Sequence, residues 1–153
     1  NVEIFKPKLD TRYAEEEVVS HNQNKIRSKT VESPNEILLL GSTCDVVGID
    51  EAQFFDESIV EVANKLANSG IRVVIAGLDM DFMGRPFGPM PNLMATAEYV
   101  TKVHAICKRT GNLANHSMRT TTNTDLVQLG ETESYEAVSR KVFNEEFLNN
   151  ENR

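Results

Sequence analysis

The sequence predicts an α/β domain built on a mainly parallel β-sheet. Three short runs rich in β-branched residues, Val2–Phe5, Asp45–Ile49 and Arg72–Gly77, have the length and composition of parallel strands covered on both faces. An amphipathic stretch, Glu57–Ser69, separates the last two runs. Because strands that alternate with helices are typical of α/β proteins, these observations together indicate that fold class.

Residues 45–77 form one predicted β-α-β unit, whose crossover should be right-handed. Asp56 is placed to cap the start of its helix, and Gly70 to end it. The apolar residues at helical spacing are Ile59, Val60, Val62, Ala63, Leu66 and Ala67.

Further elements are expected on both sides of this unit. A short helix is predicted around Asn35–Leu40, a second helix from Pro91 to about Val100, and a strand at Lys102–Cys107. Beyond them, Thr110–Asp125 is rich in Thr, Asn, Gly and Ser without regular periodicity, as in binding loops and lids. The remaining predicted elements are a short strand at Leu126–Leu129 and a terminal helix at Ser134–Leu148.

Composition narrows the class of protein. The net charge of −7 argues against nucleic acid as a partner, since binding to it requires clustered Lys and Arg. No run of 18 or more apolar residues is present, so no membrane span is expected. Two cysteines, Cys44 and Cys107, are too few for a disulfide framework or a four-thiolate metal site. A cytoplasmic protein is the simplest interpretation.

Two adjacent carboxylates, Asp50 and Glu51, follow a predicted buried strand. Ligands of open α/β sheets bind at the carboxyl ends of the strands. In phosphoryl-transfer proteins the first carboxylate commonly positions Mg²⁺, and its neighbour can accept a proton from an attacking hydroxyl. The alternative interpretation is that the pair only caps the following turn.

A second predicted strand ends in Leu78-Asp79, which would place Asp79 on the same edge of the sheet. The loop that follows is rich in Gly and Pro and contains Phe82 and Phe87, whose rings suit a flat base. A packed surface loop explains the same residues, and the pattern does not decide between the two.

Arg12 follows the first strand and could meet phosphate charge in the transition state, although the pattern alone favours a surface Arg–Asp pair. His21, His104 and His116 have no partners at metal-ligand spacing and are interpreted as structural or surface residues. The sequence contains no G-x-x-x-x-G-K-[ST] phosphate loop, and it opens on Asn1 directly before a strand. We therefore expect that this chain lacks its N-terminal segment.

Several short motifs follow one another along the chain: Asp10–Tyr13, Ser20-His21, Gly48–Phe55, Ala76–Asp79, Arg85–Gly88, Val100–Lys102 and Gly130–Glu136. In this order and spacing they resemble the type II thymidine kinases, which include the bacterial and the human cytosolic enzymes. The resemblance covers almost the whole chain. It implies a RecA-like α/β domain at residues 1–106 and a small lasso domain at 107–153 that closes over the nucleoside.

The resemblance also implies residue roles. Glu51 would be the general base toward the 5′-hydroxyl of thymidine, and Asp50 and Asp10 would act in the Mg²⁺ site near the phosphates. Arg12 would be a further catalytic residue, and it would lie with Asp10 near the transferred phosphoryl group of ATP. The residues implied in nucleoside binding are Phe54, Leu78, Phe82, Phe87, Ser117, Leu126, Gln128 and Tyr135.

Two departures from the family pattern stand out. The strand, phosphate loop and helix that open family members are missing, so the native protein is expected to have residues that this chain lacks. Many members also hold a structural Zn²⁺ with four Cys or His ligands, whereas the corresponding residues here are Cys107, Thr110, Ser139 and Val142. Because one thiolate cannot complete a tetrahedral site, no zinc is predicted.

The leading hypothesis is thus an Mg²⁺-dependent ATP:thymidine phosphotransferase of nucleotide salvage. The alternatives are a catalytically silent nucleotide-binding regulatory module and a RecA-like ATPase that moves a partner. A homotetramer and feedback inhibition by dTTP are further expectations from the resemblance.

Overall fold

The computed structural model describes residues 1–9, 17–19, 25–120 and 135–151. Contacts along the chain separate it into two units. The first unit comprises Asn1–Asp79 with Phe87–Glu98, and the second comprises Met80–Pro86 with Tyr99–Arg153. The domain boundary at residue 106 stays a prediction, because a division by contacts does not test which parts fold by themselves.

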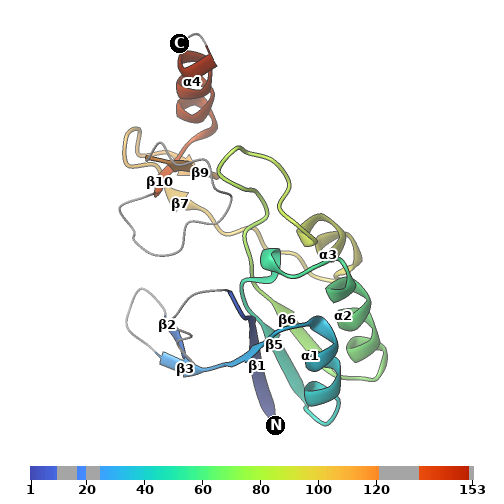
Figure 1. The fold of residues 1–153 in the computed structure, drawn as a ribbon. Coiled ribbons are helices and arrows are strands. Elements are labelled where there is room, and N and C mark those ends of the chain that lie inside the picture. Colours follow the sequence, from blue (N-terminus) through green and yellow to red (C-terminus); the bar gives the residue numbers. More distant parts are fainter. Residues whose placement is uncertain (10–16, 20–24, 121–134, 152–153) are drawn as a thin grey trace. The chain divides into compact units, whose positions relative to one another are not determined.

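A parallel sheet organises the first unit (Figure 1). Its strands lie in the order β4 (Lys29–Val31), β1 (Val2–Pro7), β5 (Val46–Ile49) and β6 (Arg72–Ile75). Each neighbouring pair is parallel, with Phe5 opposite Ile49 and Ile49 opposite Ile75 in the register. The predicted α/β class is therefore confirmed, and the three predicted strands are present with slightly different ends.

Helices α1 (Pro34–Gly41) and α2 (Ser58–Asn68) bury one face of this sheet. Phe5, Val47 and Ile49 point into the resulting core, where each is at most 2% exposed. Val2 and Val74, which lie at alternate strand positions, are 62% and 52% exposed. The expectation of a sheet covered on both faces thus holds for one face in the described part of the chain. The helical residues in this core are Ile37, Ile59, Val62 and Leu66.

The ends of α2 follow from local hydrogen bonds. An Asp56 carboxylate oxygen accepts the backbone N–H of Ser58 at 2.8 Å, but the N-cap residue of α2 is Glu57, so the predicted cap lies one residue before the observed one. At the other end, Gly70 has a φ of +85° and donates its N–H to Ala67, while Ile71 donates to Leu66. This pair of bonds is the Schellman arrangement, and it confirms the predicted stop.

Helix α3 (Met90–Thr96) is shorter than the predicted helix from Pro91 to Val100. The Thr96 hydroxyl donates to the carbonyls of Asn92 and Leu93, which satisfies acceptors at the helix end. Ala97 is then extended, and Val100 is 49% exposed. Apolar spacing alone overestimated this helix because its last apolar residues are not buried.

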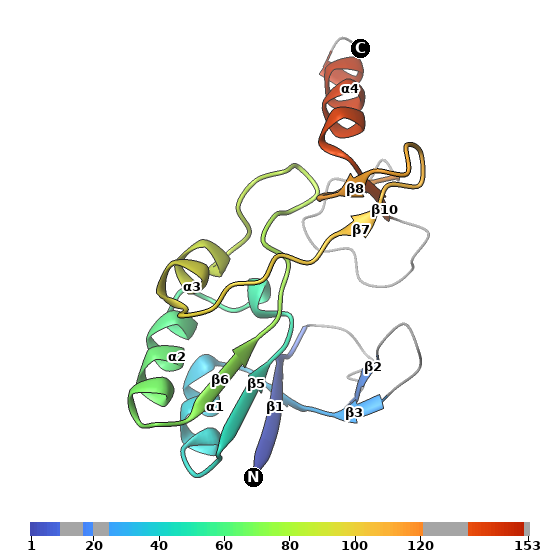
Figure 2. The same cartoon turned by 180° about the vertical axis from the view of Figure 1, so that it is seen from behind.

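The described residues of the second unit form two small antiparallel sheets and a helix. Strands β7 (Ala105–Ile106) and β8 (Leu113–Ala114) form one sheet, seen together in Figure 2. Strands β9 (His116–Arg119) and β10 (Tyr135–Val138) form the other, and α4 (Arg140–Glu151) follows.

Three predictions for this region need correction. The strand predicted at Lys102–Cys107 is only two residues long and pairs with β8 rather than with the main sheet. The segment Thr110–Asp125, expected to lack regular structure, contributes β8 and β9. The helix predicted from Ser134 begins only at Arg140, because Tyr135–Val138 pairs with β9. The predicted strand Leu126–Leu129 lies outside the described residues.

A further two-stranded antiparallel sheet joins β2 (Glu17–Val19) to β3 (Lys25–Arg27). No helix in the described part of the chain combines the length and apolar character that a membrane span requires.

Candidate functional site

Backbone hydrogen bonds fix the end of β5, from which the two predicted carboxylates emerge. The N–H of Asp50 donates to the carbonyl of Phe5 at 2.9 Å, on the β1 side. On the β6 side, Ala76 donates to Ile49 at 2.8 Å and Ala52 donates to Ala76 at 3.1 Å. Asp50 and Glu51 therefore leave the sheet at the carboxyl ends of three parallel strands, where ligands of such sheets bind.

Glu51 has an unusual backbone conformation. Its φ of 52° and ψ of 39° lie in the left-handed region, where no other non-glycine residue of the described chain is found. That conformation costs roughly 1–2 kcal/mol for a residue with a Cβ. An Asp50 carboxylate oxygen accepts the Glu51 N–H at 2.9 Å and helps to hold it. Strained residues cluster at functional sites, so this outlier supports a role for Glu51.

The side chain of Glu51 is exposed, but a hydrogen bond restrains it. Its Oε2 atom accepts a hydrogen bond from Nε2 of Gln53 at 2.5 Å. Gln53 lies in η1 (Ala52–Phe54), the short 3₁₀ helix that follows directly. Sequence reasoning did not single out Gln53 as a functional residue.

Apolar side chains stand beside these carboxylates in the first unit. Phe54 and Phe87 pack edge to face with ring centroids 5.5 Å apart, and both are partly buried. Leu78 is 49% exposed, and its N–H donates to Oε1 of Gln53. Gln53 thus joins Glu51, after β5, to Leu78, after β6, and Phe54 of η1 packs against Phe87. Asp79 follows Leu78, and its carbonyl accepts the Phe87 N–H.

In the second unit, an arginine joins two of the predicted nucleoside-binding residues. The Arg119 guanidinium lies over the Phe82 ring, 4.0 Å from its centroid, and 5.3 Å from the centroid of Tyr135. Its Nη2 atom also donates to the Tyr135 hydroxyl at 2.6 Å. Ser117, also predicted, lies two residues before Arg119 on β9 and pairs with Ala137. Sequence reasoning missed Arg119, because this segment was not predicted to contain a strand that would place Ser117 and Arg119 on the same face.

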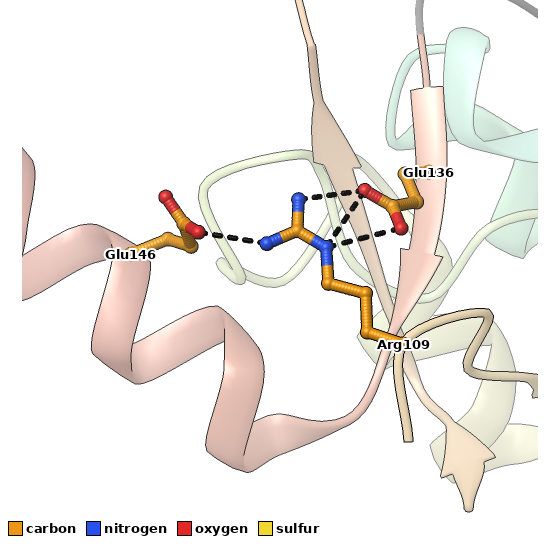
Figure 3. Close-up of polar contacts among 3 residues, drawn as sticks. All are labelled: Arg109, Glu136 and Glu146. Atoms are coloured by element: carbon orange, nitrogen blue, oxygen red, sulfur yellow. Dashed lines mark hydrogen bonds and ion pairs between the residues drawn. The ribbon is translucent and has the colours of Figure 1, made fainter. Parts of the chain in front are cut away.

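A second arginine joins strand β10 to the last helix (Figure 3). Nε and Nη2 of Arg109 donate to Glu136 of β10, and Nη1 donates to Glu146 of α4 at 2.7 Å. The hydrogen bonds to the two carboxylates raise the pKa of Arg109 above its ordinary value. The same pairing holds the pKa of Glu136 below its usual range.

The four residues that correspond to the family's zinc ligands do not form a set of metal ligands here. They are Cys107, Thr110, Ser139 and Val142. Cys107 is 1% exposed, and a hydrogen bond from the Thr110 hydroxyl lowers the pKa of its thiol to about 7. Val142 packs in the same apolar cluster, and the buried Ser139 hydroxyl has no hydrogen-bond partner in the described structure. One thiolate, two alcohols and a hydrocarbon do not fit tetrahedral zinc.

Four predicted site residues lie outside the described residues: Asp10, Arg12, Leu126 and Gln128. Within residues 1–9, 17–19, 25–120 and 135–151, no group of three or more His, Cys, Asp or Glu side chains could hold a metal ion. His116 is buried and stacks on Phe143 with centroids 4.4 Å apart, His104 is exposed, and His21 is not described.

Comparison with known proteins identifies the family of this chain. A family model described as thymidine kinase matches residues 1–143. A thymidine kinase of Bacteroides thetaiotaomicron is 58% identical over 142 residues, which cover 93% of this chain and 71% of the relative. Thymidine kinases of Bacteroides fragilis and of a Rhodothermus species are 58% and 56% identical over the same length, covering 71% and 67% of those proteins. The chain therefore belongs to the thymidine kinase family.

Proposed function

We propose that the protein transfers the γ-phosphate of ATP to the 5′-hydroxyl of thymidine and so produces dTMP for nucleotide salvage. The observation that carries this proposal is the similarity to thymidine kinases, which extends over nearly the whole chain. The carboxylate pair at the end of β5 supplies a chemical basis, since it lies where an α/β sheet presents reactive groups.

Glu51 acts as the general base in this proposal. Its carboxylate accepts the proton of the 5′-hydroxyl as that oxygen attacks the phosphorus. The left-handed backbone and the hydrogen bond from Gln53 hold the carboxylate in place before substrate arrives. Such preorganisation matters, because catalysis of phosphoryl transfer comes mainly from positioning and charge stabilisation.

Asp50 is proposed to help to hold Mg²⁺. One of its oxygens accepts the Glu51 N–H, and the side chain is partly exposed at the same edge of the sheet. A single carboxylate fits Mg²⁺, which usually keeps several waters and binds through one or two carboxylates plus substrate phosphates. When bound, the ion would neutralise charge on the β- and γ-phosphates. Asp10 and Arg12, which lie outside the described residues, are assigned to the surroundings of the transferred phosphoryl group on the family resemblance alone.

Nucleoside binding is assigned to apolar and aromatic side chains of each unit. In the first unit, Phe54, Leu78 and Phe87 offer partly exposed apolar surface to a flat base. In the second unit, the predicted residues are Phe82, Ser117, Leu126, Gln128 and Tyr135. A cytoplasmic location, a homotetramer and inhibition by dTTP complete the proposal as expectations from the family.

The test is an acceptor-dependence assay on the full-length native protein. It follows ADP release and product mass with [γ-³²P]ATP and Mg²⁺, in the presence of thymidine or of 5′-deoxythymidine, which lacks the acceptor hydroxyl. We expect labelled dTMP with thymidine alone. ATP hydrolysis of equal rate with both compounds would indicate an ATPase, and thymidine binding without turnover would indicate a regulatory module.

A further inference from the structure

Gln53 is a buried polar side chain of the first unit, at 3% exposed. It lies two residues after Glu51, and its amide makes two hydrogen bonds in different directions. Nε2 donates to Oε2 of Glu51 at 2.5 Å, and Oε1 accepts the backbone N–H of Leu78 at 3.1 Å. One side chain therefore joins the carboxylate that follows β5 to the backbone that follows β6.

Chemistry determines which way this amide is oriented. A backbone N–H can only donate, so the atom that faces Leu78 must be the amide oxygen. The amide nitrogen then faces Glu51, where an ionised carboxylate accepts hydrogen bonds and cannot donate them. Both partners thus demand the same orientation, and a flipped amide would lose both bonds.

Two glycines leave the space that Gln53 occupies. A Cβ on Gly77 would lie 2.8 Å from Oε1 of Gln53 and 2.9 Å from the sulfur of Met90. A Cβ on Gly88, whose φ is +48°, would overlap the Gln53 backbone carbonyl. The side-chain amide and the main chain of Gln53 are therefore enclosed from two segments that are distant in sequence.

We infer that Gln53 is a positioning residue that orients the Glu51 carboxylate for proton abstraction and couples it to the nucleoside-binding segment at Leu78. This inference rests on the proposed function. The amide occupies Oε2 of Glu51 and leaves Oε1 for the substrate hydroxyl. Because the amide is neutral and cannot supply a proton at neutral pH, it restrains the base without competing for its task.

A purely structural role predicts a different set of results. If Gln53 served only to accept the backbone N–H of Leu78, any side chain with an acceptor oxygen at this position would preserve activity. Gln53→Glu separates the two roles, because it keeps an acceptor for Leu78 and replaces the neutral amide donor to Glu51 with a second carboxyl group. Gln53→Met keeps the approximate volume and removes both hydrogen bonds.

The experiment measures kcat, KM for thymidine and the pH dependence of kcat for the full-length native protein and both variants. For Gln53→Glu we expect kcat to fall roughly tenfold or more near neutral pH, with KM changed less than about threefold. The acid limb of the kcat profile moves to higher pH, because two carboxylates at hydrogen-bond distance hold one proton between them. Gln53→Met lowers kcat to a similar extent without that movement of the profile.

Asn92→Asp is the matched control. Asn92 donates its side-chain amide to Glu57 at 2.9 Å, which is an amide–carboxylate pair on the exposed surface of the same unit. We expect wild-type kinetics from this control. A Gln53→Glu variant with wild-type kcat and an unmoved pH profile would overturn the inference. The double variant Gln53→Met/Glu51→Gln gives a second test. A fold-loss of kcat equal to the product of the two single losses would show that the residues act independently, and it would also overturn the inference.

An NMR measurement without substrate separates this inference from the proposed function. The side-chain amide protons of Gln53 should be protected from exchange, and their shifts should change in Glu51→Gln. A wild-type protein that does not phosphorylate thymidine would defeat the proposed function even if these signals respond. Signals that ignore Glu51→Gln, in a protein that does phosphorylate thymidine, would defeat the inference alone.

Discussion

The two units position their site residues by different means. At the edge of the first unit, backbone hydrogen bonds to neighbouring strands hold Asp50 and Ala52, and the large core of the sheet and helices lies directly behind. In the second unit, side-chain contacts connect the elements. Arg109 links β10 to α4, and Arg119 links Phe82 to Tyr135.

We infer from this difference that the sheet edge of the first unit positions the reacting groups, whereas the side-chain contacts of the second unit contribute to recognition of the nucleoside. A base must be held to within a fraction of an ångström, which a sheet edge with a rigid core provides. Aromatic and charged side-chain contacts can be adjusted by single substitutions without loss of the fold. We therefore expect substitutions of the Asp50–Glu51 pair in the first unit to act on kcat, and substitutions of Arg119 and Arg109 in the second unit to act on nucleoside affinity or local stability.

The largest expected effect is that of Glu51→Gln, which removes the proton acceptor and keeps the shape of the side chain. We expect kcat to fall by about 10²-fold or more, with thymidine affinity largely kept. Steady-state kinetics and equilibrium binding of thymidine measure the two quantities. Glu61→Gln, on the exposed side of α2, is the matched control and should behave as wild type. Unchanged turnover of Glu51→Gln would remove the base role from this residue.

Arg119→Met should have the next largest effect and a different character. It removes the cation–π contact with Phe82 and the hydrogen bond to the Tyr135 hydroxyl. We expect KM for thymidine to rise roughly tenfold, with kcat reduced less than about threefold. Arg119→Lys, which keeps the charge but not the planar group, should lie between the two. A pure loss of kcat in Arg119→Met would contradict the proposed division between the units.

Arg109→Met tests whether side chains hold the second unit together. Loss of the contacts to Glu136 and Glu146 should lower the melting temperature by roughly 2–5 °C and speed proteolysis near the hairpin. Arg140→Met, a change of the same kind at an exposed position in α4, is the control. Equal stability of the two variants would show that the Arg109 contacts are dispensable.

The smallest expected effect is a pH dependence that comes from Cys107. The Thr110 hydroxyl lowers the pKa of this thiol from 9.0 to about 7 in the folded protein. Between these two values the unfolded chain binds more protons, so stability should rise with pH across that window. The contribution is complete above pH 9 and is lost as the pH falls through 7.

Thr110→Val removes the donor and should flatten this rise, which thermal unfolding at a series of pH values would reveal. Thr96→Val, in α3 of the first unit, is the control for loss of a threonine hydroxyl. A rise of the same slope in Thr110→Val and in wild type would exclude Cys107 as its source.

The sequence predicted those parts of the site that depend on local order along the chain. The Asp50–Glu51 pair comes directly after a β-branched strand, and Leu78 follows the next one, so both lie at the same edge of any parallel sheet. Phe54 and Phe87 lie near these strand ends. The sequence therefore places them at the same edge, and the structure adds that their rings pack against each other. The α/β class followed from the same alternation.

Residues whose role depends on pairing between distant segments could not be predicted in the same way. Gln53 gains its role from Leu78, which is 25 residues away, and from space left by Gly77 and Gly88. Tyr135–Val138 was wrongly predicted as helix, because its strand partner, β9, is separated by a long segment and four residues carry little periodicity. Arg119 lies opposite Tyr135 only once that register is known.

The central claim is that Glu51 faces the hydroxyl that receives the phosphate. The most direct test is a crystal structure of the full-length native protein with thymidine, Mg²⁺ and a non-hydrolysable ATP analogue. We predict a distance of about 2.6–3.2 Å between the 5′-oxygen of thymidine and Oε1 of Glu51, with Gln53 still bonded to Oε2. A 5′-oxygen that contacts another side chain, with the Glu51 carboxylate turned away from the nucleoside, would contradict this account.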